Sequence, residues 1–176
     1  MIDQAYEPED VLYSVRGIQN DSVKTPSLRL AHLLAHLAEC GVHQAFDHMN
    51  TANRLDPKWL ATLDRVVTHA SDAGLSVIID EHDANACSDD PNACDLKLTA
   101  FWQQIGARYR AAPTSVLFEL LNEPHGNLDA DRENALLLQI PPVVRATTPH
   151  RTLVIRPANW NSLSKIGHPE AVVERP

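Results

Sequence analysis

The chain has 176 residues, of which 15 are lysine or arginine and 23 are aspartate or glutamate, so its formal net charge is −8. Hydrophobic residues make up 44% and charged residues 22%, which is typical of a globular domain, and the length favours one domain over residues 1–176. The acidic balance argues against nucleic acid as a partner, and no stretch approaches the ~18 apolar residues of a membrane span, so no membrane partner is expected.

Strand and helix patterns alternate from the beginning of the chain. Residues 11–18 predict a first strand. Residues 28–41 carry apolar side chains at helical spacing and predict a helix that ends at a glycine. Residues 42–46 predict a weak second strand. The chain therefore begins as an α/β protein.

The next helix has clear signals at both ends. Asp56 is a good N-cap, Pro57 suits the first helical position, and Gly74 lies where a helix commonly ends in a glycine. Residues 75–80 then predict a buried strand that ends in an acid. Asp95 is expected to cap a further helix, whose apolar face comprises Leu98, Phe101, Trp102, Ile105 and Tyr109.

The second half of the chain continues the alternation. Residues 115–121 predict a strand and residues 151–156 predict the last one. Between them, residues 130–146 have a helical pattern that should break at Pro141 and Pro142, because proline removes a helical hydrogen bond.

About five strands and four helices in alternation imply an α/β fold with a parallel sheet and helices outside it. Such folds place their chemistry at the carboxyl ends of the strands. The segments that should contain functional residues are therefore 44–50, 80–85, 122–126 and 157–161.

Three cysteines are too few for a disulfide scaffold. Cys87 and Cys94 are close together in a polar stretch expected to be a loop, where a local disulfide and two unpaired thiols are both open. The disulfide would require an oxidising compartment. Cys40 lies in an apolar helical run and is expected to be a buried free thiol.

The tripeptide Asn122-Glu123-Pro124 follows a predicted strand and is the strongest chemical feature. A carboxylate in a cleft at a strand end acts as a general acid near neutral pH when partial desolvation raises its pKa. The adjacent amide of Asn122 offers a donor for a sugar hydroxyl. The alternative is an ordinary glutamate at the start of a loop with a turn proline.

Longer stretches around this tripeptide resemble glycoside hydrolase family 5, the cellulase family of retaining β-glycanases. Residues 118–126 resemble its fourth-strand acid/base signature, residues 73–83 its third strand, residues 98–105 the helix between them, and residues 149–161 its fifth strand. The resemblance covers residues 55–163 in the family's order and spacing. It implies a partial (β/α)₈ TIM barrel and a single truncated glycoside hydrolase catalytic domain.

The resemblance also implies roles for individual residues. Glu123 would be the general acid/base, and Asn122 would contact the 2-hydroxyl of the sugar. His82 would line the glycone side of the cleft, and Trp160 would be a platform for sugar stacking. The alternative for His82 is a loop histidine that is hydrogen-bonded within the protein. The alternative for Trp160 is a hydrophobic plug that packs between the last strand and a loop. The implied reaction is retaining hydrolysis of a β-1,4-glucan or a related β-glycan, as in an endoglucanase, with no cofactor and no metal.

The chain departs from the family's pattern in several places. The family's nucleophile is a glutamate on a seventh strand, whereas this chain stops at Pro176, so we expect little or no turnover from the chain alone. The arginine that the family carries on its second strand has no counterpart after Gly41 and Val42. Arg156 and Glu133 stand where the family tends to have a glycine and a tryptophan.

Two other functions remain open from the sequence. One is a catalytically dead barrel remnant that binds carbohydrate weakly. The other is a metal-dependent α/β hydrolase that uses Asp80, His82 and Asp83. The resemblance favours an extracellular or periplasmic location, although the first ten residues lack the features of a signal peptide. Nothing in the sequence indicates an oligomeric state.

Overall fold

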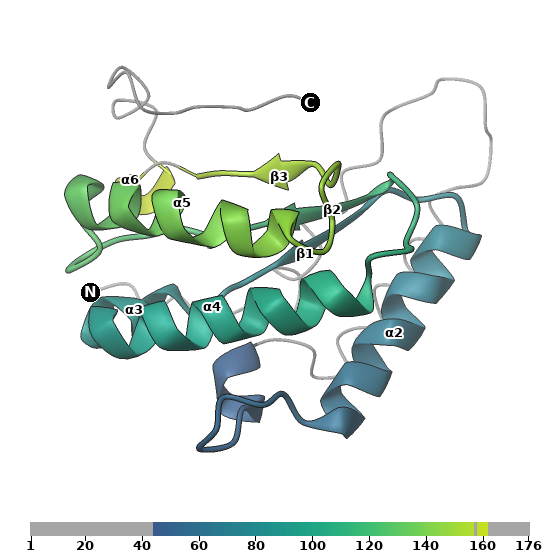
Figure 1. Ribbon diagram of the computed structural model, residues 1–176, viewed down its shortest axis with the longest axis horizontal. Helices are drawn as coiled ribbons and strands as arrows, with labels where there is room; N and C mark the ends of the chain where they lie inside the picture. Colours follow the sequence, from purple (N-terminus) through teal and green to yellow (C-terminus); the bar gives the residue numbers. More distant parts are fainter. Residues whose placement is uncertain (1–43, 157, 162–176) are drawn as a thin grey trace, which may run out of the picture.

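The computed structural model describes residues 44–156 and 158–161, which contain a three-stranded parallel sheet flanked by helices (Figure 1). The strands lie in the order β1 (Val77–Asp80), β2 (Val116–Glu119) and β3 (Leu153–Val154). Each is shorter than the sequence pattern predicts, but all three lie where strands were expected and pair in parallel. The strand and helix predicted before residue 42, and Cys40, lie outside the described residues.

The expected second strand is wrong where it can be compared with the structure. Only residues 44–46 of it are described, and two of these three begin the short 3₁₀ helix η2 (Ala45–His48). Gln44, just before it, has a left-handed backbone with φ of 51°, which does not fit a strand. The backbone N–H of Phe46 donates to Asp83 Oδ2 at 2.9 Å instead of to a neighbouring strand.

The helix α2 (Pro57–Asp72) begins and ends where the sequence predicts. The Asp56 side chain accepts hydrogen bonds from the backbone at the first turn. Gly74 has φ of 77°, and the N–H of Leu75 reaches back to the carbonyl of Ala70 at 3.0 Å. This is the bonding of a Schellman motif, which satisfies carbonyl groups left unpaired at a helix end.

The polar stretch around the cysteines is helical, so the predicted loop is wrong. It forms α3 (Ala84–Asp89) and the beginning of α4 (Pro91–Arg108). The cap of α4 is Asp90 rather than Asp95: its side chain accepts from the N–H of Ala93 at 3.0 Å. The proline after Asp90 occupies the first helical position, as in α2, and the expected apolar face of α4 is buried.

The helix α5 (Ala130–Arg145) runs without interruption through Pro141 and Pro142, contrary to the expected break. An internal proline costs a helix about 3 kcal/mol because it lacks the N–H and crowds the preceding turn. Ile140 and Val144 lie on either side of the pair, and they are 1% and 0% exposed. Burial of these side chains against the core offsets the cost of the prolines.

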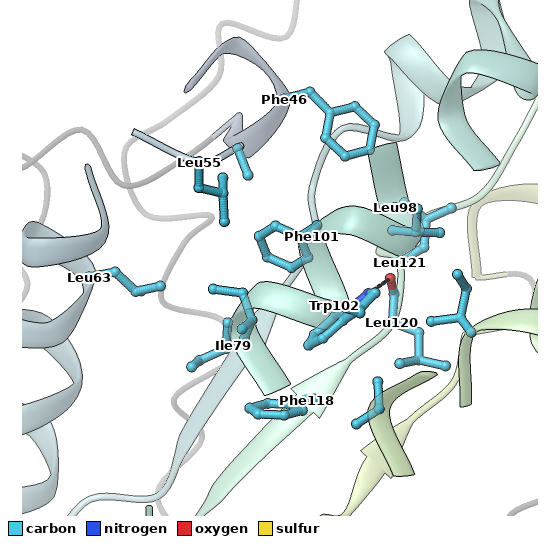
Figure 2. Packing of buried hydrophobic residues seen from close by; sticks show 14 of the residues in the cluster. Phe46, Leu55, Leu63, Ile79, Leu98, Phe101, Trp102, Phe118, Leu120 and Leu121 are labelled. Carbon is cyan, nitrogen blue, oxygen red and sulfur yellow. Dashed lines mark hydrogen bonds between the residues drawn. The ribbon is translucent and has the colours of Figure 1, made fainter. Parts of the chain in front are cut away.

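Aromatic side chains join α4 to the sheet, as Figure 2 shows. The ring of Trp102 lies 4.9 Å from that of Phe101 and 5.1 Å from that of Phe118, measured between centroids. Its indole N–H donates to the carbonyl of Leu120 at 3.0 Å. This bond secures the chain just beyond β2, where the segment leading to the candidate site begins.

The register of the sheet separates apolar from charged side chains. Ile79 pairs with Phe118, and both pack into the core beneath the helices. Asp80 pairs with Glu119 in the next position. Successive side chains of a strand point to opposite faces, so these two carboxylates belong to the face away from Phe118.

Arg151 secures the chain just before β3. It is 7% exposed, and its guanidinium donates to four backbone carbonyls at 2.6 to 2.9 Å. The acceptors are the carbonyl groups of Tyr109, Ala112, Pro113 and Val116. The side chain thereby ties the end of α4 to the beginning of β2.

Candidate active site

The carboxyl ends of the strands meet at one end of the sheet. Figure 1 shows α3 and α6 (Ala158–Asn161), which follow β1 and β3, at this same end. Beyond the ladder, the N–H of Asn122 donates to the carbonyl of Glu81 at 2.8 Å. This bond holds together the two segments that carry His82 and Glu123.

His82 and Asn122 are in direct contact. Asn122 Nδ2 lies 3.2 Å from Nδ1 and 3.4 Å from Nε2 of the His82 ring. Asp80 Oδ2 lies 3.0 Å from His82 Nδ1. A carboxylate only accepts, so Nδ1 donates to Asp80, and the Asn122 amide lies against the ring. The ring is thus oriented by two side chains, with 20% of the His82 side chain exposed.

Glu119 and Arg156 form the main ion pair of the site. Arg156 Nε lies 2.6 Å from Glu119 Oε1, and Nη2 lies 3.3 Å from Oε2. Burial raises the pKa of Glu119, and the guanidinium only partly opposes that effect. The carboxylate of Asp80 adds to the rise. In the sequence, Arg156 stands out only as a departure from a pattern. The signal for Glu119 is its position, because Glu119 and Asp80 are the terminal residues of adjacent strands.

Glu123 has a left-handed backbone with φ of 50°. Its side chain is partly exposed, and within residues 44–156 and 158–161 its carboxylate has no hydrogen-bond partner. It is close enough to Arg156 to favour the charged form of that guanidinium. The carboxylate is therefore accessible to a ligand, at the end of the sheet that also carries His82 and Asn122.

Trp160 lies beside the segment that follows Glu123. Its ring stacks on His125 with 3.6 Å between centroids and 13° between planes. Its backbone N–H donates to the carbonyl of Pro124 at 3.1 Å. The residue is 58% exposed, unlike a buried plug, so part of the indole surface is open to solvent.

A pocket lies between α4, α5 and the ends of β2 and β3. It is lined mainly by apolar side chains, with Glu133 and Arg156 as its charged members. Glu133 is 7% exposed and accepts a hydrogen bond from the backbone of Ala158, and burial raises its pKa to about 7. Neither Glu123 nor His82 lines this pocket.

The metal site considered as an alternative from the sequence is not formed by the described residues, among which no group of three or more histidine, cysteine or acidic side chains is placed to hold an ion. Asp80 and His82 bind each other. Asp83 accepts from a backbone N–H and interacts with Glu81, whose pKa is well above its usual value, chiefly because of burial. The geometry thus gives no support to a metal-dependent hydrolase.

Cys87 and Cys94 are joined by a disulfide, with their Cα atoms 4.7 Å apart. The bond connects α3 to the first turn of α4, and both residues are buried. In the part of the chain that the structure describes, no helix has the length and hydropathy needed to cross a membrane.

Comparisons with known proteins agree with this architecture. The family Cellulase (glycosyl hydrolase family 5) matches residues 34–175. Endoglucanase H of Acetivibrio thermocellus is 28% identical over 112 residues, which are 64% of this chain and 12% of that protein. Endoglucanase A of Ruminococcus albus is 35% identical over 75 residues, covering 40% of this chain and 21% of that protein.

A solved endoglucanase, Cel5A of Thermotoga maritima, has a TM-score of 0.68 and 28% identity, covering 82% of this chain and 48% of that one. A structure of Cel5A with cellobiose has a TM-score of 0.66 and 30% identity, covering 72% and 44%. The chain thus spans less than half the length of each of these relatives.

Proposed function

This chain belongs to glycosyl hydrolase family 5, and from that premise we propose that it carries the acid/base part of an endo-β-1,4-glucanase active site. Its parallel strands and helices are part of a (β/α)₈ barrel, a fold whose active sites lie at the carboxyl ends of the strands. The observation that carries the proposal is the meeting of His82 with Asn122, next to an accessible Glu123, at that end.

Glu123 is the proposed general acid/base. In retaining hydrolysis such a residue protonates the leaving oxygen and then activates the water that releases the sugar. Its carboxylate has no competing hydrogen bond in the described part of the chain, so it is available to a glycosidic oxygen. The reaction also needs a second carboxylate as nucleophile, a role that we assign to none of the described residues.

Three neighbouring side chains are proposed to bind the sugar. The Asn122 amide would donate to the 2-hydroxyl, and His82 would contact the sugar on the glycone side. Trp160 would stack on a pyranose face, a contact suited to an exposed indole. The structure of Cel5A with cellobiose supports a short β-linked glucan as the ligand class.

The proposed location is extracellular or periplasmic. A disulfide persists in an oxidising compartment, so the bond between Cys87 and Cys94 supports this assignment. The alternative of a reducing compartment would leave both thiols free.

Titration calorimetry with cellotetraose tests the binding part of the proposal. We expect the wild-type chain to bind, and Trp160→Ala to weaken binding about fivefold, because ring stacking contributes on the order of 1 kcal/mol. Leu138→Ala is the matched control, since Leu138 is an exposed apolar residue on α5. The proposal would be contradicted if the wild-type chain bound no cellotetraose, or if Trp160→Ala bound it with unchanged affinity.

Release of reducing sugar from carboxymethyl-cellulose tests the catalytic part. Any turnover by the protein must disappear in Glu123→Gln, because an amide cannot transfer the proton. Turnover that survives this substitution would refute the role of Glu123. Binding without turnover would match the weak carbohydrate binder considered from the sequence.

A further inference from the structure

The imidazole of His125 occupies a position between Glu123 and α3. Its Nδ1 lies 2.7 Å from the backbone carbonyl oxygen of Glu123, and its Nε2 lies 3.1 Å from Asn85 Oδ1. A carbonyl oxygen only accepts, so Nδ1 must carry a proton and donate it. The Asn85 amide can bind Nε2 with or without a proton. Its oxygen accepts from a protonated Nε2, and after rotation of the amide its NH₂ group donates to an unprotonated Nε2.

One face of the same imidazole is covered by Trp160. The two rings are nearly parallel, with 13° between their planes and 3.6 Å between their centroids. The Trp160 N–H also binds the carbonyl of Pro124, which lies between Glu123 and His125 in sequence. The imidazole is therefore held in its plane by hydrogen bonds and from one side by an aromatic ring.

The segments that His125 joins both have unfavourable backbone conformations. Glu123 has φ of 50°, and Asn159 and Trp160 have φ of 61° and 60°. A non-glycine residue in the left-handed region is unfavourable, so it persists only where surrounding contacts enforce it. The hydrogen bond from Nδ1 fixes the direction of the Glu123 carbonyl, and hence the peptide plane that follows this residue.

On the function proposed above, we propose that His125 is a positioning residue that holds the Glu123 backbone in its left-handed conformation, with Trp160 supporting the imidazole. The direction of the Cα–Cβ bond follows from that backbone, so His125 determines where the acid/base carboxyl points. Trp160 then has a second task besides any contact with sugar. A merely structural histidine would alter stability alone, without changing the conformation of Glu123.

Nuclear magnetic resonance of the ligand-free protein tests this role. The Cα shift and the HN–Hα coupling of Glu123 report its φ angle. In His125→Phe, which keeps an aromatic ring but has no donor, we expect both to move away from their left-handed values. Asn53 is an internal reference because its φ is 54° and it lies in another loop, so its signals should stay in place. His150→Phe, at an exposed histidine, is the matched control.

Further variants separate the ring from the hydrogen bond. Trp160→Ala should shift the Glu123 signals in the same direction by a smaller amount, and Trp160→Phe should restore them. Unchanged Glu123 signals in His125→Phe, with Asn53 also unchanged, would overturn the proposal. If His125→Phe fails to fold, the ¹⁵N shifts of the His125 ring in the wild-type protein test the proposal instead. They must show a proton on Nδ1, and a neutral ring that is protonated only at Nε2 would overturn the proposal.

These measurements need no sugar, so they separate this proposal from the function on which it rests. A wild-type protein that binds no cellotetraose, yet whose Glu123 signals move in His125→Phe, would refute the glucanase function and support the positioning role. A protein that binds cellotetraose but whose Glu123 signals ignore His125 would do the reverse.

Discussion

Replacing Glu133 with glutamine should remove a large pH dependence from the stability of the protein. Burial raises the pKa of Glu133 from its ordinary value of 4.5 to about 7. Between these two pH values the folded protein holds a proton that the unfolded chain has released. The contribution of Glu133 to the free energy of unfolding is therefore greatest below about pH 4.5, and it falls as the pH rises to 7. The expected loss is about 3 kcal/mol.

The substitution Glu133→Gln keeps the size of the side chain and an oxygen that accepts from the N–H of Ala158, but it cannot ionise. We expect the free energy of unfolding of the glutamine variant, relative to that of the wild type, to rise by about 3 kcal/mol between pH 4.5 and pH 8. The buried carboxyls of Glu81 and Glu119 are present in both proteins, so their contributions cancel in the difference.

Urea unfolding followed by tryptophan fluorescence at several pH values measures this difference. Asp131→Asn is the matched control, because Asp131 is an exposed acid on the same helix. It should leave the pH profile parallel to that of the wild type. Parallel profiles for Glu133→Gln as well would refute the reasoning, because they would show that Glu133 has the same pKa in the folded and unfolded states.

Three further predictions concern stability. Replacing Cys87 and Cys94 with serine should lower the free energy of unfolding by about 2 kcal/mol in denaturant titrations, and equal midpoints with and without reductant in the wild type would contradict this. Arg151→Met should cost roughly 3 kcal/mol, because buried carbonyls lose their donor; a loss below about 0.5 kcal/mol would show that water replaces the guanidinium. Gly126→Ala should lower the melting temperature, because Gly126 has φ of 61° and an added Cβ would clash with Ser88 Oγ. Adding Ser88→Ala should restore only the part of the melting temperature that the clash removes. Full recovery would show that the backbone at this position is not strained.

Local signals in the sequence predicted the parts of the fold that depend on neighbouring residues. Asp56 and Pro57 marked the start of α2 because capping involves only a few adjacent backbone groups. The same Asp-Pro signal at Asp90 was missed, because the polar residues around the cysteines favoured a loop. The helix through Pro141 and Pro142 could not be predicted locally, since tertiary burial of its neighbours decides the outcome.

The candidate site was likewise predictable from the sequence only in part. Alternating strands and helices placed His82 and Glu123 at one end of the sheet, because parallel strands share their carboxyl edge. The contact of His125 with Asn85 spans 40 positions in sequence, and the raised pKa of Glu133 depends on burial by distant segments. No local pattern reports such contacts, so the structure was needed to identify them.

The pairing of Asp80 with Glu119 has a consequence for the fidelity of folding. If β2 slipped by one residue along β1, every side chain of the strand would move to the other face. Glu119 would then enter the apolar layer that Phe118 now occupies, far from the guanidinium of Arg156, and an unpaired buried carboxylate costs several kcal/mol. The charged end of the strand therefore disfavours misaligned sheets during folding. The carboxylates at the candidate site thus also help to select the correct strand register.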